Sequence, residues 1–151
     1  MSIKSDEAVT EFNSDLQALW ETPPRKLVFL ARSFGRHALE LGNPIPTDPL
    51  YFLKAPSALL PPGEILYLPT DCEEVHYEAE VAVLIGSKIS QADPSEAERA
   101  IAGWTILNDV TARAQQRKDG GRFTRAKGYD GFCPISGQLL PYLSWQTAYI
   151  Q

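Results

Sequence analysis

The chain alternates between apolar and polar positions in several short stretches, and this period of two predicts β-strands. The clearest stretch is 75–86, VHYEAEVAVLIG. Its odd-numbered positions from 77 to 85 carry apolar or aromatic side chains on one face, and the opposite face carries Glu78 and Glu80. Further strands are predicted at 26–31, which should be buried, at 50–53 and at 103–109.

Helical spacing is confined to fewer segments. Apolar residues between 8 and 19 recur every three or four positions, so 6–21 should form an amphipathic helix that serves for packing or as a dimer face. Gly120-Gly121 should open a loop that contains Lys127. Short helices are also predicted at 35–41, at 96–102 behind a cap at Asp93 or Ser95, and at 111–118.

Strands outnumber helices in this pattern, which indicates a mostly β, α+β fold and not a doubly wound α/β sheet. A length of 151 residues suits one compact domain, which we place at 26–151 after an N-terminal helical extension at 1–25. Hydrophobic residues make up 44% of the chain, enough to form a core.

Charge, hydrophobic runs and cysteine content limit the partners and the cellular compartment that we expect for the protein. The net charge of −5 argues against nonspecific nucleic-acid binding, because phosphate contacts need clustered Lys and Arg. No apolar run approaches the roughly 20 residues that span a bilayer, and the start MSIKSDEAV is too polar for a secretory signal. Cys72 and Cys133 lie in no Cys-x-x-Cys pair, so two free thiols in a cytoplasmic protein are expected.

Glu78 and Glu80 are the first candidates for chemistry. Two positions apart on a strand, they share a face and lie about 7 Å apart at about 3.3 Å per residue. Such carboxylates repel each other unless a cation or a proton lies between them. All-oxygen ligands favour Mg²⁺, Mn²⁺ or Ca²⁺ over zinc. A half-exposed strand with two solvated glutamates would produce the same pattern.

Asp109 strengthens the metal hypothesis. It follows the apolar run GWTILN at a strand-to-helix junction, a place where functional side chains are common. An aspartate there could equally be the N-cap of the helix that follows. Together with Glu78 and Glu80 it would complete a set of three carboxylates.

Two further groups could manage a proton and an anion. His37 and Glu40 share a helical face in RHALELG, where the carboxylate can orient the imidazole and raise its basicity. A surface ion pair is the alternative. Lys127 could pair with a substrate carboxylate or polarise a carbonyl. Arg113 and Gln116, three apart on the following helix, could reach the same pocket or remain solvated.

Five segments in this order resemble the fumarylacetoacetate hydrolase superfamily, in its acylpyruvase and oxaloacetate decarboxylase branch. They are RSFGRHALELGNPIP, PLYFLKAPSALLPPGE, VHYEAEVAVLIG, IAGWTILNDVTARAQQ and FTRAKGYDGFCP, within about 26–134. The resemblance implies a mixed β-sandwich or β-roll, usually as a homodimer. The chain departs from the family at Ser33-Phe34, often Asn-Tyr there, and after Pro134. It ends at Gln151, so we expect the family's C-terminal part to be incomplete.

The resemblance also implies a ligand set for one metal ion, an acid–base pair, a catalytic lysine and three substrate-binding side chains. Mg²⁺ is the expected ion, with Mn²⁺ or Ca²⁺ possible. In this sequence the metal ligands match Glu78, Glu80 and Asp109, the acid–base pair His37 and Glu40, the lysine Lys127, and the substrate-binding residues Arg113, Gln116 and Lys54.

A metal-dependent enzyme for a small anionic 2-oxo or diketo acid follows from these assignments. The acid would chelate the ion, which would stabilise the enolate that leaves when the C–C bond breaks. His37, steered by Glu40, would activate water in an acylpyruvate-type hydrolase. Two alternatives stay open: an oxaloacetate-type decarboxylase or oxo-diacid isomerase of the same family, and a truncated, inactive chain that binds metal or has a regulatory role.

Overall fold

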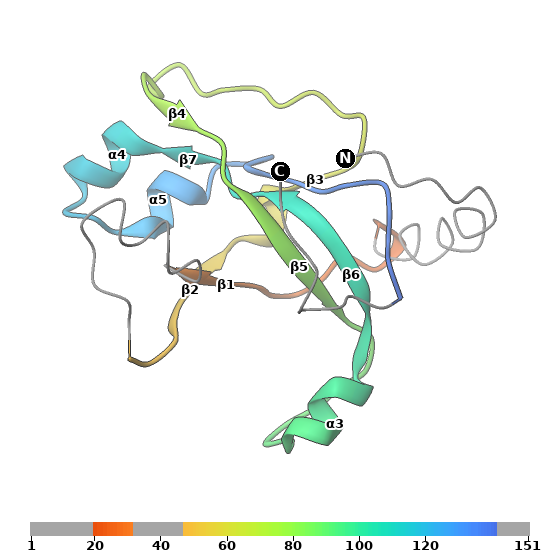
Figure 1. The fold of residues 1–151 in the computed structure, drawn as a ribbon. Helices are drawn as coiled ribbons and strands as arrows, with labels where there is room; N and C mark the ends of the chain where they lie inside the picture. The colour runs from red at the N-terminus through yellow and green to blue at the C-terminus, as the bar shows by residue number, and fades with distance from the viewer. Residues whose placement is uncertain (1–19, 32–46, 142–151) are drawn as a thin grey trace.

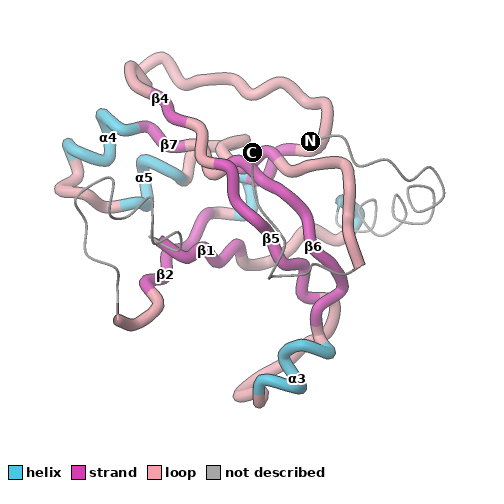
Figure 2. The backbone as a smooth tube through the Cα atoms, viewed as in Figure 1, coloured by secondary structure: helices cyan, strands magenta, loops and turns pink. Residues whose placement is uncertain are grey.

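The fold consists of two-stranded sheets joined by long loops, with short helices at the periphery (Figures 1 and 2). A computed structural model describes residues 20–31 and 47–141. The expected mostly β, α+β fold is confirmed. The predicted helix at 35–41, and all but the last two residues of the one at 6–21, lie outside the described residues. In chain order the elements are β1 (Leu27–Ala31), β2 (Leu50–Lys54), the 3₁₀ helix η1 (Pro56–Ala58), β3 (Leu59–Leu60), β4 (Val75–His76), β5 (Ala79–Ile85), α3 (Pro94–Arg99), β6 (Ile101–Asn108), β7 (Thr111–Ala112), α4 (Arg113–Lys118), α5 (Phe123–Lys127) and β8 (Cys133–Pro134).

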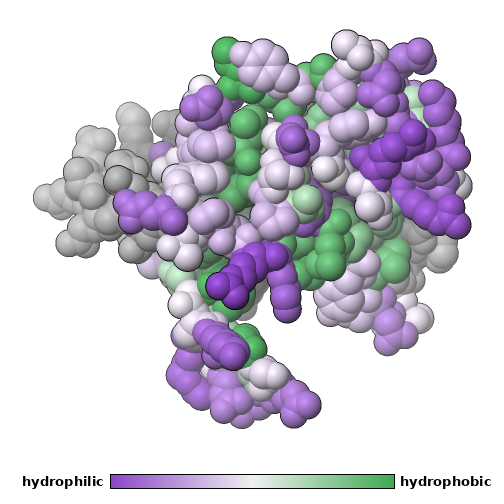
Figure 3. Space-filling model, turned by 180° about the vertical axis from the view of Figure 1, so that it is seen from behind, coloured by the Kyte–Doolittle hydropathy of each residue, from purple (hydrophilic) through white to green (hydrophobic). Residues whose placement is uncertain are grey.

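β1 and β2 form an antiparallel pair with one packed face and one exposed face. Phe29 lies opposite Phe52 with ring centroids 5.1 Å apart, and Phe52 packs against Phe123 at 4.8 Å. Seen from behind, the molecule shows hydrophobic surface in the region of these strands (Figure 3). The prediction of a buried strand at 26–31 was wrong for its outer face, because nothing in the described part of the chain covers it. The exposed residues are Val28, Leu30, Tyr51 and Leu53.

The ladder that carries the acidic residues is interrupted in its middle. β4 pairs with β7 and β5 pairs with β6, both antiparallel and in one shared register. Between the two pairings Glu78 lies opposite Asp109, whose N–H donates to the Glu78 carbonyl at 2.7 Å. The Glu78 N–H donates to the Asn108 side chain at 3.0 Å and not to a ladder carbonyl. The predicted single strand at 75–86 is therefore two strands, with Tyr77 and Glu78 between them.

α3 connects β5 to β6 and begins at one of its two predicted caps. Asp93 accepts a hydrogen bond from the Glu96 N–H at 2.8 Å, and the Glu96 carboxylate accepts one from the Asp93 N–H at 3.0 Å. This reciprocal pair is a capping box. The helix ends at Arg99, earlier than predicted, because Ile101 already pairs with Ile85 in the sheet.

α4 and α5 follow β7 and bring basic residues to the interruption. α4 begins at Arg113, so the start of the predicted helix at 111–118 is strand. Its N-cap is Ala112, which rules out the alternative that Asp109 caps it. Lys127 is the last residue of α5 and not part of a loop as predicted. This helix was missed because it has five residues and no capping side chain, so it leaves no periodic pattern.

A small buried core joins β7 to the loop before β8. Val110, Ala112 and Phe132 have at most 2% of their surface exposed. Cys72 and Cys133 are free thiols, as expected. Within the described ranges, no helix is long and apolar enough to cross a membrane.

Candidate active site

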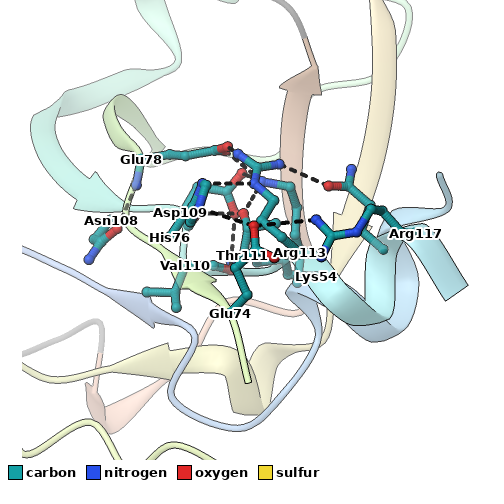
Figure 4. Close-up of polar contacts among 12 residues, drawn as sticks. Lys54, Glu74, His76, Glu78, Asn108, Asp109, Val110, Thr111, Arg113 and Arg117 are labelled. Carbon is teal, nitrogen blue, oxygen red and sulfur yellow. Dashed lines mark hydrogen bonds and ion pairs between the residues drawn. The ribbon is translucent and has the colours of Figure 1, made fainter. Parts of the chain in front are cut away.

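Asp109 is the buried centre of a charged cluster at the interruption of the ladder (Figure 4). Lys54 Nζ lies 2.6 Å from its Oδ1, and Lys127 Nζ lies 2.5 Å from its Oδ2. Oδ1 accepts no well-directed hydrogen bond despite that short distance, so its interaction with Lys54 is an ion pair. One buried carboxylate is therefore neutralised by two ammonium groups from separate elements, β2 and α5.

Lys127 connects Asp109 to the second acidic residue, Glu78. Its ammonium donates to Glu78 Oε2 at 2.7 Å, to Asp109 Oδ2 at 2.5 Å and to Thr111 Oγ1 at 2.7 Å. These three acceptors use all three donors of the ammonium. The structure thus brings Lys127 to two of the predicted ligands, while its catalytic role stays a prediction.

Lys54 is enclosed inside the protein. Its side chain has no exposed surface. Besides the Asp109 ion pair, its ammonium donates to the carbonyls of Phe132 at 2.5 Å and Val110 at 3.4 Å. Burial lowers the pKa of Lys54, and Asp109 opposes this shift. The ammonium therefore faces two backbone carbonyls and the Asp109 carboxylate inside the protein, and the predicted substrate contact of Lys54 stays a prediction.

Glu78 is held in its ionised form by two cations. Arg113 donates to its Oε1 and Lys127 to its Oε2. Burial alone would raise the pKa of Glu78, but Lys127 and Arg113 outweigh burial and hold the pKa below its ordinary value.

Glu80 lacks such neutralisation. It is half-buried on β5, and its carboxylate makes no hydrogen bond or ion pair with another described residue. Burial raises the pKa of Glu80 to about 7, and the negative charges of Asp109 and Glu78 contribute to the shift. The three carboxylates therefore lie near enough to one another to interact electrostatically. Strand spacing predicted this closeness for Glu78 and Glu80 but not for Asp109.

This donor set fits a hard divalent cation. Three carboxylates supply oxygen ligands of the kind that Mg²⁺, Mn²⁺ and Ca²⁺ prefer. Glu80 resists ionisation beside two other acids, and a divalent cation would reverse that resistance. As they lie, no three Asp, Glu, His or Cys side chains in the described ranges converge on one ion position, and the Lys127 ammonium lies between Glu78 and Asp109 instead. The metal set stays a prediction.

Arg113 reaches the cluster from the first residue of α4. Its Nη2 donates to Glu78 Oε1, and its Nη1 donates to Gln116 Oε1 at 2.9 Å. The two residues predicted to share a pocket, Arg113 and Gln116, are therefore in contact beside the carboxylates. The Nε of Arg113 donates to His76 Nδ1 at 3.2 Å. We did not predict a role for His76, although its place two positions before Glu78 on the same predicted strand face was a usable signal.

His37 and Glu40 lie outside the described residues, and their acid–base role stays a prediction. Within the described cluster, no cation neutralises the carboxyl group of Glu80, and the guanidinium of Arg113 is partly exposed. Such an arrangement can bind a cation and an anion side by side. A separate groove of about 570 Å³, lined mainly by apolar residues such as Leu60 and Tyr67, contains none of the predicted site residues.

Comparisons with known proteins place these residues in a family context. The family model described as Fumarylacetoacetate (FAA) hydrolase C-terminal matches residues 26–149. The mitochondrial oxaloacetate decarboxylase of Dictyostelium discoideum is 39% identical over 126 residues, which are 81% of this chain and 57% of that protein. Oxaloacetate tautomerase YcgM of Escherichia coli strain K12 is 37% identical over 123 residues, 80% of this chain and 56% of that protein.

A solved structure shows the same relationship. 5-Carboxymethyl-2-hydroxymuconate delta-isomerase from Mycobacterium smegmatis has a TM-score of 0.68 and 40% sequence identity, over 79% of this chain and 47% of that chain. This chain spans about half the length of the curated relatives it matches. Because the family model covers most of the sequence, the chain belongs to the fumarylacetoacetate hydrolase family.

Proposed function

We propose that this chain is a metal-dependent enzyme that acts on a small 2-oxo acid through an enolate, with oxaloacetate as the first substrate to test. The observation that carries the proposal is the cluster in which Asp109, Glu78 and Lys127 meet beside Arg113. Relatives named as an oxaloacetate decarboxylase and an oxaloacetate tautomerase support the choice of substrate class.

Arg113 is the residue we assign to the substrate carboxylate. Its side chain is 21% exposed, so it is reachable from solvent while Glu78 and Gln116 hold it in place. Planar N–H donors of a guanidinium bind carboxylates in pairs, which would fix the orientation of the acid.

Lys127 is the residue we assign to the charge that develops on the substrate. Its ammonium is already fixed by Glu78, Asp109 and Thr111, so little reorganisation is needed when an oxyanion forms nearby. Donation to a substrate would require it to exchange one of these three acceptors. Lys54 keeps the partner carboxylate of Asp109 in place from the buried side.

Glu78, Glu80 and Asp109 would hold the divalent ion. Bound there, Mg²⁺ would supply Lewis-acid stabilisation of the negative charge on the substrate. The direct test is a calorimetric Mg²⁺ titration of Glu78→Gln and Glu80→Gln, with Glu98→Gln on exposed α3 as the matched control. We expect weaker binding in the first two only. Unchanged Mg²⁺ affinity in both site variants would show the ligand set to be wrong.

Hydrolytic cleavage of an acylpyruvate is the second candidate. The pair His37 and Glu40 in RHALELG favours it, because water attack needs a general base that decarboxylation does not. Oxaloacetate and an acylpyruvate should therefore be assayed side by side, with Mg²⁺ and with chelator. If His37→Ala leaves acylpyruvate turnover unchanged, this residue has no hydrolytic role.

The site variant for either reaction is Arg113→Gln, compared with Lys118→Gln on the same helix. Both remove one positive charge from α4, but Lys118 is exposed and lies outside the cluster. We expect KM for the acid to rise at least tenfold in the first variant alone, since hydrogen bonds to charged groups contribute about 1.5–3 kcal/mol. Equal KM values in the two variants would contradict the role of Arg113.

If the wild-type chain binds Mg²⁺ without turnover of either acid, the binding or regulatory alternative holds instead. A homodimer, tested by light scattering, is also part of the proposal.

A further inference from the structure

The Arg113 guanidinium belongs to a ring of four side chains that begins and ends on α4 (Figure 4). Arg113 Nε donates to His76 Nδ1 at 3.2 Å, and His76 Nε2 lies 3.5 Å from Glu74 Oε1. The Glu74 carboxylate in turn pairs with Arg117, Nη2 to Oε2 at 2.5 Å. Arg117 lies one helical turn after Arg113, so the ring closes on the same helix.

The backbone reinforces this ring. The Arg113 N–H donates to the Glu74 carbonyl at 2.8 Å, and His76 pairs with Thr111 between β4 and β7. The main chain therefore holds Glu74, His76 and Arg113 in place relative to one another, in addition to the contacts between their side chains. A substitution that changes only one of these side chains leaves the backbone contacts in place.

The contacts of His76 define its tautomer. A neutral imidazole has one donor nitrogen and one acceptor nitrogen. Because Nδ1 accepts from Arg113, Nε2 carries the proton and faces the Glu74 carboxylate. Arg117 holds the pKa of Glu74 below its ordinary value, so this carboxylate is ionised at neutral pH and favours the tautomer.

The ring leaves part of Arg113 available for a ligand. A guanidinium has five N–H donors. Among the described residues its acceptors are His76 on Nε, Gln116 on Nη1 and Glu78 on Nη2. One donor on each terminal nitrogen remains, which is the number that a paired contact with a carboxylate needs.

We propose that His76 is a positioning residue that fixes the Arg113 guanidinium for the substrate carboxylate, with Glu74 holding His76 in the required tautomer. This inference rests on the proposed function, in which Arg113 binds that carboxylate. His76 acts through Arg113 and is about half exposed, with 52% of its side-chain surface accessible. Its replacement should therefore change ligand binding without unfolding the protein.

The experiment compares three variants of the whole chain with the wild type. His76→Leu removes both imidazole nitrogens, and His76→Asn keeps an acceptor close to the position of Nδ1. Tyr77→Leu changes the highly exposed neighbour and is the matched control. Oxalate binding in the presence of Mg²⁺ is measured by calorimetry, KM and kcat for oxaloacetate by steady-state kinetics, and hydrogen exchange of the Arg113 Nε–H by ¹⁵N NMR.

For His76→Leu we expect oxalate affinity to fall about fivefold, the factor that corresponds to one hydrogen bond, with KM raised and kcat unchanged. The Arg113 Nε–H should exchange faster and the melting temperature should stay constant. His76→Asn should restore both affinity and slow exchange to near the wild-type values, and Tyr77→Leu should match the wild type throughout. A role limited to folding would lower the melting temperature and would not produce this split between KM and kcat.

Arg113→Gln distinguishes a failure of the positioning role of His76 from a failure of the proposed function. If Arg113→Gln weakens oxalate binding and His76→Leu does not, the positioning role is overturned and the proposed function stands. If wild-type and Arg113→Gln proteins bind oxalate equally or not at all, the proposed function fails at this residue, and the inference about substrate fails with it. Unchanged Nε–H exchange in His76→Leu overturns the ring itself, whatever oxalate does.

Discussion

Replacing Lys54 by methionine would remove a buried charge while keeping most of the side-chain volume. The methionine would lose the cation–π contact of the ammonium with Phe29, whose ring centroid lies 5.2 Å from Lys54 Nζ. It would lose the ion pair with Asp109 and the hydrogen bond to the Phe132 carbonyl. The change therefore separates the electrostatic role of this residue from its packing role.

The expected loss of stability depends on the charges that remain after Lys54 is replaced. Removing one partner of a buried pair typically costs about 3–5 kcal/mol, because the other charge is left without compensation. Here Lys127 still neutralises Asp109 from the opposite side, and the desolvation of Lys54 itself is relieved. We therefore expect the lower end, about 3 kcal/mol in the free energy of unfolding. This is a large share of the about 5–15 kcal/mol that a folded domain has.

Urea unfolding followed by tryptophan fluorescence, in buffer with chelator, measures this quantity, and Trp104 is buried enough to report it. Lys88→Met at an exposed position is the control and should change stability by less than about 0.5 kcal/mol. The double variant Lys54→Met/Asp109→Asn should lose less than the sum of the single variants. Equal stabilities of Lys54→Met and Lys88→Met would refute the reasoning.

Three further predictions concern side chains other than those of the charged cluster. Asp93→Ala should lower the free energy of unfolding by about 1 kcal/mol, because the cap bond to the Glu96 N–H is lost. Phe132→Ala should lower it by about 3–5 kcal/mol through a core cavity, since the ring is fully buried. Burial raises the pKa of both thiols, that of Cys133 to about 11, and Cys133 is also fully buried, so at pH 8 iodoacetamide should label the half-buried Cys72 first. Because the thiolate is the reactive form, Cys133 labelling should rise with pH up to about 11.

These predictions have simple controls. Ser87→Ala on an exposed bend and Tyr67→Ala on the surface should leave the urea midpoint unchanged. Peptide mass spectrometry distinguishes the two thiols, and the urea-unfolded chain should label both equally. Faster native labelling of Cys133 than of Cys72, or an Asp93→Ala midpoint equal to the wild type, would contradict the burial and the cap described above.

The acidic part of the site could be predicted because strand geometry is local. Two glutamates in alternate positions must share a face, whatever surrounds them. That Asp109 lies directly across from Glu78 depends on the register between distant segments, which no pattern within one segment determines. The resemblance to a family supplied that connection, while the two-residue interruption itself was not anticipated.

The basic part of the site could be predicted only in outline. The sequence predicts a loop around Lys127, since a five-residue helix between glycines has no periodic signal. The enclosure of Lys54 depends on the carbonyls of Val110 and Phe132, more than 50 residues away in the sequence. The apolar run at 26–31 predicts a buried strand, because burial of apolar side chains is favourable. The run does not indicate which other segment covers the outer face of β1.

The apolar outer face of β1 and β2 has a consequence for the chemistry on the other side of the same strands. Leu53, more than half exposed, is joined by one peptide bond to Lys54, which is fully enclosed against Asp109. A change in backbone twist at Leu53 would also move the backbone of Lys54, since the two residues are consecutive in one strand and their side chains point to alternate faces. Solution conditions that drive apolar surfaces together would therefore act on the geometry of the charged cluster without touching any of its polar atoms.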